Sequence, residues 1–116
     1  MKVRIAFYLH LPFCVRKCRY CDFNSRPASE AERDQYLQAL RCEIAGRAHE
    51  LADGLEIATI YFGGGTPTLY DAGDLAGVLD LIAEAFAVSS DAEITVEANP
   101  ETLDAAKLRG LVAAGV

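Results

Sequence analysis

The sequence predicts an α/β fold in which parallel strands alternate with helices. Runs of β-branched, aromatic and other apolar residues occur at 3–9, 57–62 and 94–98, and a stretch with helical periodicity follows each run. Alternation of this kind calls for parallel strands joined by right-handed helical crossovers. Two types of sheet satisfy that rule, an open doubly wound sheet and a (β/α) barrel.

The positions of the unusual residues favour the barrel. Three cysteines follow the first apolar run, three glycines follow the second, and Glu97 and Asn99 stand at the end of the third. Active sites of α/β barrels are built from residues at the carboxyl ends of the strands. Three strand–helix units cannot close a barrel, so we expect the 116 residues to be part of a larger domain.

The first strand and the first helix have clear signals. The strand at 3–9 is nearly continuous in apolar character, as expected of a parallel strand buried on both faces. Ser29 and Glu32 predict a capping box at the start of the helix. Cys42 and His49 are expected on the outer face of this helix. Its buried stripe is predicted to consist of Leu37, Leu40, Ile44, Ala48 and Leu51.

The second and third units repeat this arrangement. The strand at 57–62 runs directly into three glycines, and a helix is expected after Asp71. The third strand, at 94–98, is followed by Thr102, which is predicted to cap a last helix that ends at Gly115. The buried face of the middle helix is predicted to consist of Leu75, Val78, Leu79, Ile82 and Phe86.

The composition excludes several classes of partner. With 52% hydrophobic and 24% charged residues, the chain has the composition of a soluble globular protein. Its net charge of −6 leaves no basic face for nucleic acid. No apolar run approaches the roughly 18 residues of an integral membrane segment, and no signal-peptide pattern is present. We therefore expect a cytoplasmic protein, in which thiols stay reduced and clustered cysteines favour a metal over a disulfide.

Cys14, Cys18 and Cys21 form a Cys-x3-Cys-x2-Cys motif. Three thiolates this close in sequence can hold one metal centre, and the basic residues between them lower thiol pKa. A 4Fe–4S cluster usually takes four thiolates, so three leave one iron open to a substrate or cofactor. The alternatives are a zinc site completed by His10 and three unrelated buried thiols.

The glycine loop and Glu97 are the second candidate site. Residues 63–67 lack the Lys-Ser/Thr ending of a Walker loop. The glycines allow a ligand to approach the backbone, and successive amides can form a nest for a carboxylate. Glu97 would suit an ammonium, a sulfonium or ribose hydroxyls. The alternatives are a simple turn for the glycines and a solvated carboxylate for Glu97.

Together these motifs resemble the start of a radical S-adenosylmethionine (SAM) enzyme. More narrowly, residues 8–14, 21–25, 62–68 and 93–100 resemble the oxygen-independent coproporphyrinogen III oxidase family and its heme-chaperone branch. The resemblance covers nearly the whole chain. It implies that 1–116 are the N-terminal, incomplete part of a radical SAM core domain, the first three βα units of a partial (β/α)6, TIM-like barrel.

The resemblance also implies roles for individual residues. Cys14, Cys18 and Cys21 would hold three irons of a 4Fe–4S cluster, and the amino and carboxylate groups of SAM would chelate the fourth. One electron from the reduced cluster then cleaves the sulfonium, which is chemistry that belongs to the cofactor. The residues that match the family's SAM site by position are Tyr8, Tyr20, Gly64, Gly65, Thr66 and Glu97.

Phe23 separates the two branches of the family. The oxidases carry a further cysteine at this position, so Phe23 favours the chaperone branch in porphyrin and heme metabolism, which binds heme and passes it to acceptor proteins. The resemblance also implies an electron donor. The alternatives are an oxygen-independent coproporphyrinogen III oxidase, which forms protoporphyrinogen IX by oxidative decarboxylation, and a zinc-binding structural module. Family members are several times longer, so heme function is expected only in a longer parent protein, and whether the chain is an enzyme stays open.

Overall fold

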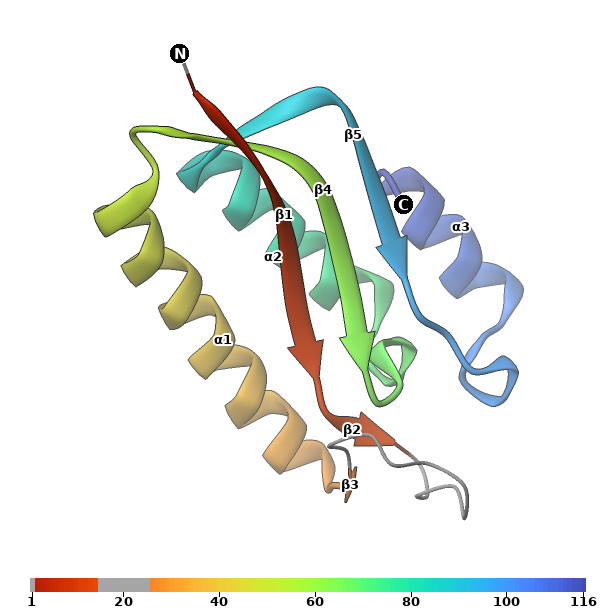
Figure 1. The fold of residues 1–116 in the computed structure, drawn as a ribbon. Coiled ribbons are helices and arrows are strands. Elements are labelled where there is room, and N and C mark those ends of the chain that lie inside the picture. The colour runs from red at the N-terminus through yellow and green to blue at the C-terminus, as the bar shows by residue number, and fades with distance from the viewer. Residues whose placement is uncertain (1, 15–25) are drawn as a thin grey trace.

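The computed structural model describes residues 2–14 and 26–116. Its centre is a parallel three-stranded sheet, shown in Figure 1, in the order β1-β4-β5. The strands are β1 (Val3–Leu11), β4 (Leu55–Gly64) and β5 (Ala87–Val96). Both strand pairs are parallel and the order in space follows the order in sequence, as in a barrel.

In the residues described, three helices follow the three strands of the sheet. They are α1 (Glu30–Leu51), α2 (Ala72–Ala85) and α3 (Ala105–Ala113), with short 3-10 turns η1 (Pro67–Leu69) and η2 (Pro100–Thr102). Figure 1 shows α2 behind the sheet, α1 alongside β1 and α3 beside β5, while the front of the sheet is open. Parallel strands in sequence order with their helices on one face are what the first units of a barrel have, and half of a doubly wound sheet has the same arrangement.

The core lies between the sheet and the helices. Leu9, Phe62 and Val96 align across the three strands on the covered face, and Leu9 and Phe62 are fully buried. Side chains of α1 and α2 close the core from the other side. These buried helix residues are Leu37 and Ile44 of α1, and Leu75, Val78, Leu79 and Ile82 of α2.

The other face of the sheet is open, which corrects the expectation that β1 is buried on both faces. Tyr8, Tyr61 and Thr95 align across the strands on this face. The side chains of Tyr8 and Tyr61 are 56% and 39% exposed. Within the described residues the helices cover one face of the sheet only. The apolar run at 3–9 predicted burial on both faces, whereas the side chains of β1 point alternately to the covered face and to the open face.

The predictions made for α1 are confirmed in part. The capping box is confirmed, because the backbone N–H of Glu32 donates to Ser29 Oγ at 3.2 Å. Cys42 and His49 are exposed, as expected, but Leu51 is 50% exposed and does not belong to the buried stripe.

In the described part of the chain, no helix is both long enough and apolar enough to cross a membrane.

The last helix begins two residues later than expected. Thr102 is the end of η2, and the N-cap of α3 is Asp104, whose carboxylate accepts from the backbone N–H of Lys107 at 2.7 Å. The prediction for Thr102 was wrong because its hydroxyl donates to the carbonyl of Asn99 instead. The prediction for Gly115 is confirmed, since its φ of +108° is the left-handed conformation that ends a helix.

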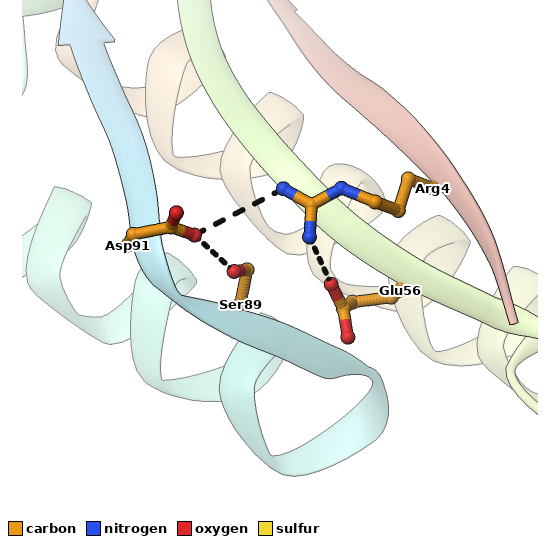
Figure 2. Close-up of polar contacts among 4 residues, drawn as sticks. All are labelled: Arg4, Glu56, Ser89 and Asp91. Atoms are coloured by element: carbon orange, nitrogen blue, oxygen red, sulfur yellow. Dashed lines mark hydrogen bonds and ion pairs between the residues drawn. The ribbon is translucent and has the colours of Figure 1, made fainter.

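At the amino end of the sheet an ionic cluster joins the three strands, as Figure 2 shows. Arg4 Nη1 of β1 lies 2.6 Å from Glu56 Oε1 of β4, and Arg4 Nη2 lies 3.9 Å from Asp91 Oδ1 of β5. The hydroxyl of Ser89 donates to the same oxygen of Asp91. All these groups are exposed or half-exposed, so the cluster is a surface feature.

Candidate functional site

The carboxyl ends of the three strands lie at one edge of the sheet, opposite the ionic cluster. His10 of β1 is the register partner of Gly63 of β4. Glu97 lies one residue past the end of β5, and its backbone N–H still donates to the carbonyl of Phe62 at 3.0 Å. β5 begins at Ala87, well before the expected start at residue 94, but its carboxyl end places Glu97 at this edge as predicted.

Hydrogen bonds within the protein use the first amides of the glycine loop. The Gly65 N–H donates to the carbonyl of Leu11 at 2.8 Å, and the Thr66 N–H donates to the carbonyl of Phe13 at 2.7 Å. The Gly64 N–H donates to Glu97 Oε1 at 2.9 Å. An amide has only one proton to donate. The expectation that these amides form a nest for a ligand carboxylate is therefore wrong for residues 64–66.

The glycines serve instead to bring backbone segments close together. Gly64 has a φ of +114°, which is strained for residues with a side chain. At Gly65, a Cβ atom would lie 2.4 Å from the carbonyl oxygen of Phe13, well inside van der Waals contact. Only a residue without Cβ allows the loop to run against the chain at Phe13.

Two donors from β4 hold the carboxylate of Glu97. Gly64 N–H donates to Oε1 at 2.9 Å, and the phenol of Tyr61 donates to Oε2 at 3.1 Å. The bond to the carboxylate is the main cause that raises the pKa of Tyr61 above 10.0. Sequence reasoning missed Tyr61. Period-2 alternation puts Tyr61 on the same face as Gly63, but only the register between β4 and β5 places it beside Glu97.

Tyr8 extends this group onto β1. Its ring stacks on that of Tyr61, with centroids 5.9 Å apart and an interplanar angle of 23°. Its hydroxyl shares a hydrogen bond of 3.1 Å with His10 Nδ1. Partial burial, and then the charge of Glu97, raise the pKa of Tyr8. The structure thus brings together Tyr8, Gly64 and Glu97 from the predicted site residues, and adds Tyr61.

The first cysteine of the motif lies at the same edge. Cys14 is a half-buried free thiol in the short strand β2 (Phe13–Cys14), which pairs with β3 (Arg26–Pro27). Its neighbour Phe13 accepts the hydrogen bond from Thr66, so β2 is joined directly to the glycine loop. Cys14 therefore stands next to the segment that carries Gly64 and Gly65.

The rest of the motif lies outside the described residues. This applies to Cys18, Tyr20, Cys21 and Phe23. Among the residues that the structure describes, no three His, Cys, Asp or Glu side chains gather into a metal site. The chemistry of the motif itself suits an iron–sulfur cluster, since these clusters are held by cysteine thiolates.

A buried threonine ties the loop after β4 to the loop after β5. Thr68 is fully buried, and its Oγ1 lies 2.6 Å from Thr102 Oγ1 and accepts from the Asn99 N–H at 3.4 Å. The Lys107 ammonium donates to the Thr68 carbonyl at 2.5 Å. Sequence reasoning did not find this contact, because nothing in the local pattern links two loops 30 residues apart.

The model of the radical SAM superfamily matches residues 8–116, which is nearly the whole chain. The chain belongs to the radical SAM superfamily. The match covers β1, the cysteine motif, the glycine loop and Glu97, so the fold and the edge described above are those of a radical SAM domain.

Two of the relatives that are similar to this chain are heme chaperones. The heme chaperone HemW of Escherichia coli K12 is 40% identical over 113 residues, which cover 97% of this chain and 30% of that protein. HemW of Mycobacterium tuberculosis H37Rv is 43% identical over 98 residues, covering 82% of this chain and 25% of the relative. This radical SAM chain thus spans between a quarter and a third of the length of these relatives.

A solved structure has the same fold. The structure titled coproporphyrinogen III oxidase (HemN) from Escherichia coli, a radical SAM enzyme, superposes with a TM-score of 0.87 at 33% identity. The superposition covers 98% of this chain and 26% of HemN. The predicted α/β fold with the strand–helix units of a radical SAM barrel is confirmed.

Proposed function

We propose that the chain binds a 4Fe–4S cluster and SAM at the carboxyl edge of its sheet, within a protein that acts as a heme chaperone. The observation that carries the proposal is the grouping of Tyr8, Gly64 and Glu97 beside the strand of Cys14. Membership of the radical SAM superfamily supports both cofactors, because cluster and SAM binding are general to that family.

The residues at this edge fit the cluster. Cys14 offers a half-buried thiol, and Cys18 and Cys21 follow it at the spacing of the family motif. Three thiolates would hold three irons and leave the fourth open to SAM. When bound, the reduced cluster supplies the electron that cleaves the sulfonium. The zinc alternative would use His10 as the fourth ligand, and would leave the glycine loop and Glu97 without a role.

The chain's own residues would bind and orient SAM. Glu97 places a fixed negative charge on the open face, and Tyr8 and Tyr61 expose ring surface beside it. A carboxylate next to aromatic faces attracts a cation, and the sulfonium of SAM is one. Gly64, Gly65 and Thr66 would line the site without donating their amides, which are used within the protein, and Tyr20 would complete it.

Anaerobic reconstitution tests the cluster. We expect about four irons and an equal amount of sulfide per chain, bound by an oxygen-sensitive site. Cys14→Ala, Cys18→Ala or Cys21→Ala should abolish iron loading. Cys42→Ala is the matched control, because Cys42 is an exposed thiol on α1 and should not affect loading. Equal loading of the Cys18→Ala variant, or stoichiometric zinc without iron, would contradict the proposal.

The assignment to the heme-chaperone branch rests on two observations. Relatives at 40% and 43% identity are named heme chaperones, whereas the HemN structure is 33% identical. Phe23 also stands where the oxidases carry a cysteine, by resemblance. The proposed partners are heme, an electron donor and a heme-acceptor protein, in the reducing environment of the cytoplasm.

Two assays on a longer parent protein would distinguish a heme chaperone from a coproporphyrinogen III oxidase. The parent should bind heme, and it should not convert coproporphyrinogen III under anaerobic conditions with reductant and SAM. Phe23→Cys should not by itself create the oxidase, because the substrate pocket must also match. Formation of protoporphyrinogen at enzymatic rates by the unmodified parent would restore the oxidase assignment.

A further inference from the structure

We infer that Tyr61 is a positioning residue for SAM binding, and that it acts by holding the carboxylate of Glu97 in one orientation on the open face of the sheet. The inference rests on the proposed function and adds to it a residue that the cofactor motifs do not include. Tyr61 lies on β4 ahead of the glycine loop, and Glu97 lies just past the end of β5.

The sheet register places the two side chains together. Tyr61 is the partner of Thr95, which stands two residues before Glu97, so Tyr61 and Glu97 are diagonal neighbours on one face. The Tyr61 phenol donates to Oε2 at 3.1 Å, while the Gly64 N–H donates to Oε1 at 2.9 Å. Each carboxylate oxygen is thus held by a separate donor from the same strand, which fixes the plane of the carboxylate.

Two neighbours limit where the phenol can go. The Tyr8 ring stacks on the Tyr61 ring, with centroids 5.9 Å apart. At Gly63, a Cβ atom would lie 2.8 Å from Tyr61 Cε1 and 2.7 Å from Glu97 Oε1. The absence of a side chain at Gly63 therefore leaves the space in which the phenol and the carboxylate meet.

This arrangement matters because Glu97 is exposed. A glutamate in solvent samples several rotamers, and a ligand that needs one of them must bear the cost of ordering it. A carboxylate oxygen can accept more than one hydrogen bond, so both oxygens retain acceptor capacity for a ligand. Tyr61 and Gly64 therefore order the carboxylate of Glu97 before SAM binds, and both of its oxygens can still accept a hydrogen bond from the ligand.

The Tyr61→Phe variant tests the inference, since it keeps the ring and its stacking on Tyr8 and removes only the hydroxyl. Equilibrium dialysis of the cluster-loaded protein against SAM should show about fivefold weaker binding, as expected for the loss of one exposed hydrogen bond of ordinary strength. Tyr70→Phe is the matched control. Tyr70 also donates its phenol proton, but to the carbonyl of Arg33, and its removal should leave SAM affinity unchanged.

A double-variant cycle separates positioning from a general structural effect. In a Glu97→Ala background, Tyr61→Phe should weaken SAM binding no further, because the group that Tyr61 positions is gone. A Tyr61→Phe protein that binds like the unmodified one would overturn the inference. The same fivefold loss with and without Glu97 would also overturn it.

A second measurement needs no cofactor. In the protein labelled with ¹³C at the tyrosine rings, NMR titration should show Tyr61 with a raised pKa that falls toward its ordinary value in Glu97→Ala. No change would mean that the contact does not exist in solution. If this titration succeeds but the unmodified cluster-loaded protein binds no SAM, the contact stands, while the proposed function and the positioning role for SAM both fail.

Discussion

The two ends of the parallel sheet are held together by different kinds of contact. Each end joins β1, β4 and β5 through charged or polar groups. At the amino end Arg4 bridges Glu56 and Asp91 with exposed side chains alone. At the carboxyl end the Gly64 backbone and the Tyr61 phenol hold Glu97, and the glycine loop runs against the chain at Phe13. Flexible side chains can adjust to a change, whereas a closely packed backbone cannot, so substitutions should have larger effects at the carboxyl end.

The largest effect is expected for Gly65→Ala. Its Cβ would lie 2.4 Å from the carbonyl oxygen of Phe13, so the hydrogen bond from Thr66 to that carbonyl must break. We expect a loss of about 3 kcal/mol in the free energy of unfolding, measured by urea denaturation. The matched control is Gly46→Ala in α1. It meets no atom within 4 Å, and should stabilise by about 0.5–1 kcal/mol. Equal effects at the two positions would contradict the packing described for the loop.

Glu97→Ala should separate binding from stability. The side chain is exposed, so the free energy of unfolding should change by less than about 1 kcal/mol. SAM affinity of the cluster-loaded protein should fall at least about tenfold, because the fixed negative charge is lost. Glu93→Ala is the matched control, since Glu93 is an exposed glutamate on the same strand and the same face. A similar loss of affinity in both variants would mean that only the overall charge matters.

Arg4→Ala should slightly lower the free energy of unfolding and leave SAM affinity unchanged, which is the reverse of the result expected for Glu97→Ala. Exposed ion pairs contribute about 0.2–1 kcal/mol, and salt screens them. We expect a loss in this range in dilute buffer, which disappears in about 1 M NaCl, where the screening length is only about 3 Å. SAM affinity should not change, because Arg4 lies at the opposite end of the sheet from Glu97. A loss that persists in high salt would show that the amino end is also fixed by packing.

The smallest effect concerns the pKa of Asp91. The hydrogen bond from Ser89, a backbone hydrogen bond and the charge of Arg4 lower this pKa below 3.8. A depressed carboxyl pKa adds stability above the unfolded-state value, and this contribution is lost as the pH falls through the lower folded-state value. Ser89→Ala should therefore raise the pKa of Asp91 in an NMR titration. An unchanged pKa would mean that Ser89 does not donate to Asp91 in solution.

The sequence predicted the order of the elements and the edge that carries the site. Strand and helix periodicity, together with the capping box of Ser29, depend on residues close in sequence. The start of β5 was placed too late because 87–93 mix small and polar residues. Register across strands then decides which side chains meet, and periodicity alone gave no register. Tyr61 and the contact between Thr68 and Thr102 were missed for that reason.

The role expected of the glycine loop was wrong in one respect. Glycines after a strand predict close backbone approach, and the structure has it, but the approach is to the protein's own chain at Leu11 and Phe13. The sequence cannot show whether an amide faces a ligand or a carbonyl, because both need the same absence of Cβ. Among the residues that the structure describes, Glu97 therefore presents charge at this edge, and the amides of residues 64–66 support the protein itself.

The buried hydroxyl of Thr68 has a consequence for the timescale of motion. Since its side chain contacts Thr102 and Asn99, the two loops that carry Gly64 and Glu97 should open together or not at all. Amide hydrogens in both loops would then exchange with solvent at a common rate set by one opening event. In Thr68→Val the two rates should part, and the loop after β5 should exchange faster. A site whose two halves fluctuate as one body would present the same shape to each SAM molecule that arrives.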